Sequence, residues 1–186
     1  IIMNPTFLEL AQQIKDCRFE DESLDLSHID LQVREMWRGS HLSRLQILLS
    51  VLYERDNTDI KDLILSGCNL TAADTTELAL VIRALSALEE LILDKMDIAE
   101  LCARGNTTFL EELRAKDSLT RLFITEATLT PEVAQIIFTY VQLPRIKELI
   151  LSRNPLGQAG LVAVFSQRPD SLEVLELAEC GLTAAS

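Results

Sequence analysis

The sequence has few of the residues on which most enzymes depend. It contains only two histidines, His28 and His41, and they do not form an H-x-x-x-H pair. A glycine-rich phosphate loop and the G-x-S-x-G motif are also missing. Carboxylates are numerous but scattered along the chain, which is typical of a solvated surface. These absences predict a protein that is not an enzyme and that needs no cofactor.

Cysteine is scarce as well. The four cysteines are Cys17, Cys68, Cys102 and Cys180; none are paired as C-x-x-C, and both histidines are far from them in sequence. This spacing predicts neither a metal site nor a catalytic thiol. Reduced thiols suit an intracellular setting, so we expect a cytoplasmic protein.

The sequence also has few positively charged residues and no long apolar run. The chain carries 17 Lys and Arg against 29 Asp and Glu, a net charge of −12. Phosphate binding needs clustered Lys and Arg, so we expect no nucleic acid partner. The charge is compatible with a basic protein partner, although solubility alone would also explain it. No apolar run reaches ~18 residues, so no membrane span is expected.

The pattern that organises the chain is clearest between residues 146 and 156. Apolar residues stand at Ile146, Leu149, Leu151 and Leu156, with Asn154 between the last two. Alternation around Leu149 and Leu151 predicts a short strand with one buried face. The spacing, L-x-x-L-x-L-x-x-N-x-L, resembles the leucine-rich repeat, and the following L-G-x-x-G resembles its longer ribonuclease-inhibitor-like subclass. In that family such an asparagine bonds backbone groups of neighbouring coils, so the resemblance implies this role for Asn154.

Four further copies of this spacing are present. The second apolar positions of the five copies are separated by 28, 31, 27 and 26 residues, and they are Leu63, Leu91, Leu122, Leu149 and Leu175. An insertion at Gly105-Asn106 explains the long step. One unit cannot bury its own apolar face, so the copies must stack. The resemblance implies an α/β fold: a right-handed leucine-rich-repeat solenoid, or horseshoe arc, with parallel strands on the concave face and helices on the convex face.

Helices are expected between the strands. Thr71 with Asp74 resembles a capping box, and Thr130 followed by Pro131 fits an N-cap and a first helical position. Apolar spacing predicts further helices over residues 131–143 and 158–168.

We divide the chain into an N-terminal helical cap with a degenerate first repeat, residues 1–59, and five leucine-rich strand units, residues 60–186. Asn4-Pro5 predicts the start of a first helix that ends near Cys17. Because the last unit stops at Ser186 without its helix, we expect a longer protein to continue there.

The first repeat, with apolar residues at Leu24, Leu26, Ile29 and Leu31, is oversized. Its extra length holds Trp37 and a predicted helix over residues 42–52. We expect the tryptophan to be buried against a helix, and an exposed anchor is the alternative.

Residues that alternate with the buried leucines are expected on the concave face. Strands lie ~4.8 Å apart, so four apolar residues of the central column should form a continuous strip rimmed by charge. The simpler explanation is that such residues favour strands wherever they stand. We predict a partner-binding surface made of Ile64, Ile92, Phe123, Ile150, Asp94, Arg121, Glu148 and Glu176.

Three functions fit these features. The first is an intracellular protein–protein interaction module, a scaffold, adaptor or sensor segment of a larger protein. The second is a regulator of a GTPase or of actin assembly built on the same repeats. The third is a bacterial effector with a separate catalytic domain, although such effectors usually carry shorter repeats. Fold alone does not select among them.

Overall fold

The computed structural model describes residues 6–16, 20–54, 59–102, 107–141, 145–166 and 170–184. Its helices are α1 (Phe7–Lys15), α2 (Arg44–Tyr53), the 3-10 turn η1 (Ala72–Asp74), α3 (Thr75–Ala84), α4 (Ile98–Leu101), α5 (Thr108–Ala115), α6 (Pro131–Tyr140) and α7 (Gly157–Phe165). Its strands are β1 (Ser23–Asp25), β2 (Arg34–Trp37), β3 (Ser40–Ser43), β4 (Asp62–Ile64), β5 (Glu90–Ile92), β6 (Arg121–Phe123), β7 (Glu148–Ile150) and β8 (Val174–Glu176).

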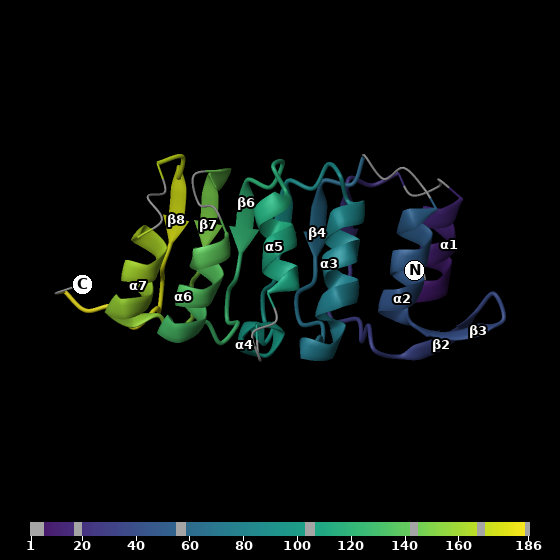
Figure 1. Cartoon of the computed structure of the whole chain (residues 1–186), viewed down its shortest axis with the longest axis horizontal. Helices are drawn as coiled ribbons and strands as arrows, with labels where there is room; N and C mark the ends of the chain where they lie inside the picture. The colour runs from purple at the N-terminus through teal and green to yellow at the C-terminus, as the bar shows by residue number, and fades with distance from the viewer. Residues whose placement is uncertain are drawn as a thin grey trace, which may run out of the picture.

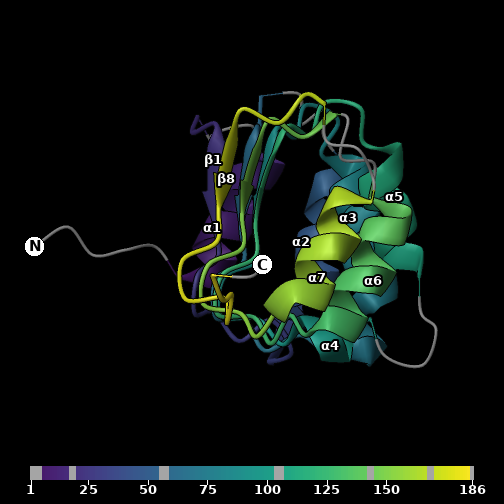
Figure 2. The same ribbon diagram turned by 90° about the vertical axis from the view of Figure 1, so that its left-hand side faces the viewer.

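Six strands form one parallel sheet in the order β1-β4-β5-β6-β7-β8. Each connection from one strand to the next passes through the helical side, so the chain winds as a stack of coils (Figure 1). Figure 2 looks along this stack and shows the sheet as one layer and helices α2, α3, α5, α6 and α7 as the other. This is the leucine-rich-repeat solenoid that the spacing predicted.

The leucines of the repeat lie side by side, as expected. Leu63, Leu91, Leu122, Leu149 and Leu175 are paired in register on neighbouring strands. The first four are 0% exposed, whereas Leu175 on the last strand is half-buried. Register is fixed because a slip by one residue would turn every leucine to the opposite face. Leu24 of β1 continues the row and is also 0% exposed.

Asn154 joins two coils, which confirms the role that the resemblance implied. Its Oδ1 accepts hydrogen bonds from the backbone N–H groups of Ala127 (2.9 Å) and Leu129 (3.1 Å) in the preceding coil. Its Nδ2 donates to the carbonyls of Ile124 (2.5 Å) and Leu151 (2.8 Å). Because the side chain is 1% exposed, these bonds satisfy backbone groups that water does not reach.

At the equivalent position of two other coils, a cysteine thiol bonds a backbone carbonyl of the preceding coil. The thiol of Cys68 donates to the carbonyl of Leu26 (3.0 Å), and that of Cys180 donates to the carbonyl of Leu151 (3.1 Å). Both are buried, as is Cys102. Asn154, Cys68 and Cys180 therefore share one feature at this position, a buried donor that bonds a backbone carbonyl of the preceding coil.

The residue just before the position of Cys68, Asn154 and Cys180 has a left-handed backbone conformation in every coil. Six residues, each four positions after the second leucine, have positive φ: His28 (61°), Gly67 (69°), Lys95 (55°), Glu126 (50°), Arg153 (60°) and Glu179 (55°). Only one of the six is glycine, although L-residues rarely adopt this conformation. A Cβ at this glycine would lie 2.3 Å from the imidazole Nδ1 of the histidine in the preceding coil, so this coil requires glycine.

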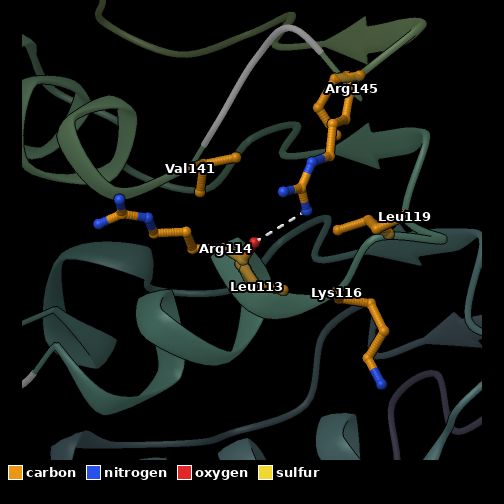
Figure 3. Close-up of a pocket in the computed structure, with 7 residues that line it drawn as sticks. Leu113, Arg114, Lys116, Leu119, Val141 and Arg145 are labelled. Carbon is orange, nitrogen blue, oxygen red and sulfur yellow. Dashed lines mark hydrogen bonds between the residues drawn. The ribbon is translucent and has the colours of Figure 1, made fainter.

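Cationic side chains join the coils on the helical side. The ammonium group of Lys116 donates to the carbonyls of Arg83 (3.4 Å) and Leu85 (3.0 Å) at the end of α3. Arg145 likewise donates to the carbonyl of Arg114 (3.2 Å) at the end of α5 (Figure 3). A cation at a helix C-terminus complements the helix dipole and satisfies its free carbonyls. The crevice between these residues has a volume of only about 10 Å³, so it holds no ligand site.

The N-terminal helix differs in detail from its prediction. Helix α1 begins at Phe7, after a capping box formed by Thr6 and Glu9, rather than at Pro5. Asn4, Pro5 and Cys17 lie outside the described residues. The helix packs on α2 with its apolar side buried.

A β-hairpin occupies the oversized first unit, and the prediction of a helix from residue 42 was wrong there. Strands β2 and β3 are antiparallel, so Leu42 lies in β3 and the helix begins only at Arg44. The turn places Arg38 (φ 49°) and Gly39 (φ 81°) in the left-handed region, which is typical of a tight hairpin turn. Trp37 is 8% exposed, which confirms its burial.

The later helices follow the capping predictions closely. Thr71 and Asp74 form the expected capping box, although it opens the 3-10 turn before α3. Thr130 caps α6 with Pro131 at its start. Helix α7 begins at Gly157, one residue early, and the insertion at 105–106 and the predicted ends at 143 and 168 lie outside the described residues. No helix in the described ranges is long and apolar enough to span a bilayer.

Candidate functional site

The face of the sheet that helices leave open carries the predicted site. Figure 2 shows α2, α3, α5, α6 and α7 together on one side of the sheet, so no helix of the described residues covers the other face of β4 to β8. Along each strand, the residues that alternate with the buried leucines point to this open face. We call it the concave face. It presents three rows of side chains that run across the strands.

The central row unites the predicted apolar residues. Strand pairing places Ile64 beside Ile92, Ile92 beside Phe123, and Phe123 beside Ile150. We call these four residues the apolar strip. Glu176 follows at one end, as expected, and Asp25 of β1 precedes the strip at the other. Asp25 was not predicted, because it belongs to the degenerate first repeat, which lies outside the five regular units.

The apolar strip is shallower than its composition suggests. Ile64, Ile92 and Phe123 are half-buried, and Ile150 is only 8% exposed. The flanking rows therefore cover the sides of these residues and leave their ends accessible. A partner would contact a low apolar ridge rather than enter a deep groove.

One flanking row carries more negative than positive charge. It consists of Asp62, Glu90, Arg121, Glu148 and Val174, in register on successive strands. The guanidinium Nη2 of Arg121 lies 3.3 Å from Asp62 Oδ1, and its Nε lies 3.5 Å from Glu90 Oε1. One cation therefore faces the carboxylates of two neighbouring coils. A third carboxylate in the row is left without a cation.

The surroundings of Glu90 favour its protonated form. Burial raises the pKa of the Glu90 carboxyl above its ordinary value, and the charges of Asp62 and Glu148 raise it further. The Arg121 cation opposes this rise without cancelling it. Glu148 is half-buried, and its carboxylate forms no hydrogen bond or ion pair with any residue that the structure describes. It borders a recess of about 240 Å³ at the edge of the sheet, between β6, β7 and β8.

The opposite flanking row is polar but already bonded. It consists of Ser66, Asp94, Thr125, Ser152 and Ala178, each two residues after the end of one of the strands β4 to β8. Asp94 Oδ1 accepts from the backbone N–H of Thr125 (2.9 Å). Glu176 Oε1, at the end of the central row, accepts from the hydroxyl of Ser152 (3.0 Å). These two carboxylates link neighbouring strands, a role that the sequence did not reveal.

Among the residues that the structure describes, no three His, Cys, Asp or Glu side chains gather in a way that could hold a metal ion. Burial raises the pKa of the thiols of Cys68 and Cys102 to about 11, so both are protonated at neutral pH. A protonated, buried thiol is a poor nucleophile.

The stacked strands, the bonded Asn154 and the open concave face together define a leucine-rich-repeat protein. No protein-family model matches the chain. The ribonuclease inhibitor of Sus scrofa is 33% identical over 133 residues, which cover 68% of this chain and 28% of that protein. The ribonuclease inhibitor of Mus musculus is 28% identical over 165 residues, 87% of this chain and 35% of that protein. The chain belongs to the ribonuclease-inhibitor-like leucine-rich-repeat proteins.

The chain spans only about a third of the length of these curated relatives. A solved structure with the same fold is the tropomodulin C-terminal domain of Caenorhabditis elegans, with a TM-score of 0.56. The two chains are 10% identical, and the match covers 90% of this chain and 93% of that one. At this identity the likeness concerns the fold alone.

Proposed function

We propose that this chain is a protein-interaction module that binds a basic protein partner through the concave face. The observation that carries the proposal is the apolar strip beside a row with excess negative charge. Interfaces commonly combine an apolar centre with a polar rim. Glu148, half-buried and unpaired within the described residues, supplies a carboxylate that a partner's Lys or Arg would neutralise.

The relatives support a protein partner. Both are named ribonuclease inhibitors, and a ribonuclease is a protein. Repeat proteins in general bind partners on their extended concave surfaces. Because this chain matches only part of these relatives, the nature of its own partner rests on the concave face and not on their names.

A cytoplasmic location and a non-enzymatic role belong to the same proposal. Three buried cysteines without disulfides suit a reducing compartment. A scaffold, adaptor or sensor would need only the binding face. Regulation of a GTPase or of actin assembly is a narrower form of the proposal, and assays of nucleotide hydrolysis and of actin polymerisation with the purified chain would distinguish it.

The test compares proteins captured by the immobilised wild type and by two variants. Phe123→Asp places a charge in the middle of the apolar strip. Ile136→Asp is the matched control, because Ile136 is 40% exposed on α6, on the helical side. Truncating a hot-spot residue at the centre of an interface costs about 2 kcal/mol or more, which is over tenfold in affinity.

We expect a set of basic proteins to bind the wild type and Ile136→Asp, and to be lost with Phe123→Asp, in quantitative mass spectrometry. Far-ultraviolet circular dichroism and thermal unfolding of each variant check that the fold is kept. A milder variant, Phe123→Ser, serves if the aspartate unfolds the chain. Identical captured sets from all proteins would rule out the concave face.

A further inference from the structure

We infer that the partner element which docks on the concave face is an amphipathic α-helix that lies across the strands. Its apolar stripe would rest on the apolar strip, and its Lys and Arg residues would face the row of Asp62, Glu90 and Glu148. This inference rests on the proposed function and specifies the occupant of the same site. Three properties of the concave face carry it: its backbone, its spacing and its asymmetry of charge.

The backbone of the strip has no hydrogen bonds to offer. The carbonyls of Ile92, Phe123 and Ile150 already accept N–H groups of the neighbouring coil, each at 2.9 Å. These bonds lie in the plane of the sheet. An extended segment placed across the strands would bury N–H and C=O groups that find no partner, which is costly. A helix satisfies its backbone internally, so it can lie on this face without that cost.

The spacing of the strip also favours a helix. Successive residues of the apolar strip are about 4.8 Å apart, because they stand on neighbouring strands. Residues three or four apart on a helix are separated by about 4.5 to 6 Å along its axis, given a rise of 1.5 Å per residue. Residues on one side of an extended segment are about 6.6 to 6.8 Å apart, so they do not match the spacing of the apolar strip. The four residues of the apolar strip span about 14 Å, which is the length of about ten helical residues.

The charges give the helix a preferred rotation. On one side of the strip stand Asp62, Glu90 and Glu148, with Arg121 as the sole cation of that row. On the other side, Asp94 is already bonded to a backbone N–H, and its neighbours are uncharged hydroxyl and methyl groups. Lys and Arg on one flank of the apolar stripe therefore match the first side. A neutral polar flank matches the second.

The experiment selects the binder from a random library, because the natural partner is unidentified. Peptides of about 16 random residues, displayed on phage, are panned against the whole chain. We expect the enriched sequences to repeat apolar residues at i, i+3, i+4 and i+7, with Lys or Arg along one flank. Synthetic copies of these peptides should gain helical circular dichroism on binding. A central proline should weaken their binding at least tenfold.

Variants of the chain locate the bound peptide. Phe123→Asp should weaken binding at least tenfold, and Ile136→Asp should leave it unchanged. Glu148→Lys should weaken it more at low salt than at high salt, whereas Glu132→Lys, the same charge change on α6, should have little effect.

The outcomes separate the two proposals. Peptides that depend on Phe123 but alternate apolar and polar residues, or that tolerate a central proline, would overturn the helix while leaving the concave face as the site. Enriched peptides that ignore Phe123, or no enrichment at all, would count against both.

Discussion

Replacing Asn154 by alanine tests the reasoning about the coils most directly. The substitution leaves the buried N–H groups of Ala127 and Leu129 without their acceptor. Each orphaned buried donor costs about 1 to 3 kcal/mol. We therefore expect the free energy of unfolding to fall by about 2 to 6 kcal/mol, a large share of the ~5 to 15 kcal/mol that holds a typical domain together.

A second substitution divides this effect. In Asn154→Cys the thiol can still donate to the Ile124 carbonyl of the preceding coil, as Cys180 donates to the Leu151 carbonyl of its own preceding coil. It provides at most a weak acceptor for the two N–H groups, so we expect a loss between that of the alanine variant and zero. The control is Asn69→Ala. Asn69 directly follows Cys68 and is exposed, so its replacement should change stability by less than about 0.5 kcal/mol.

Urea unfolding followed by circular dichroism measures the total effect. Hydrogen exchange measures the local one, because only the amides of Ala127 and Leu129 should lose protection beyond the average of the chain. A stability loss below about 1 kcal/mol, or unchanged exchange at these two amides, would refute the role assigned to the asparagine.

Three further predictions concern single sites. Gly67→Ala should lower the melting temperature, because it combines a φ of 69° with a Cβ 2.3 Å from the imidazole of His28, and His28→Ala should restore part of the loss; an unchanged melting temperature would contradict the clash. Glu90→Gln should raise stability at neutral pH, because the raised pKa of Glu90 means that the folded state binds its proton more tightly than the unfolded state. This gain should shrink as the pH falls towards the ordinary value of 4.5, and a gain that grows in acid would refute the assignment. Cys68 and Cys102, with pKa values of about 11, should react with a disulfide reagent at pH 8 only as fast as the chain unfolds, and rapid labelling in the native state would contradict their burial.

Two short segments differ from their predictions, the β2–β3 hairpin and the start of α1. The hairpin of β2 and β3 was missed because its outer face carries Met36 and its turn is Arg38-Gly39, so neither clear alternation nor an Asn-Gly turn marks it. The start of α1 was placed too early because Asn4-Pro5 offered a plausible cap. The Thr6 and Glu9 pair satisfies the same helix end by a reciprocal arrangement.

The sequence by itself determined the repeat, the strands and their register. Leucines that alternate along a strand and recur every 26 to 31 residues can be buried together in only one alignment, so the order of the concave rows follows from spacing alone.

Tertiary structure decided which of the aligned side chains remain free. Asp94 and Glu148 are both acidic residues of the concave rows, yet the first is bonded to a backbone N–H and the second has no bonded partner in the described coils. Ile150 is nearly buried while Ile64 is half-buried. These differences depend on distances between coils, which residues far apart in the sequence set jointly. A periodic pattern within one coil does not contain them.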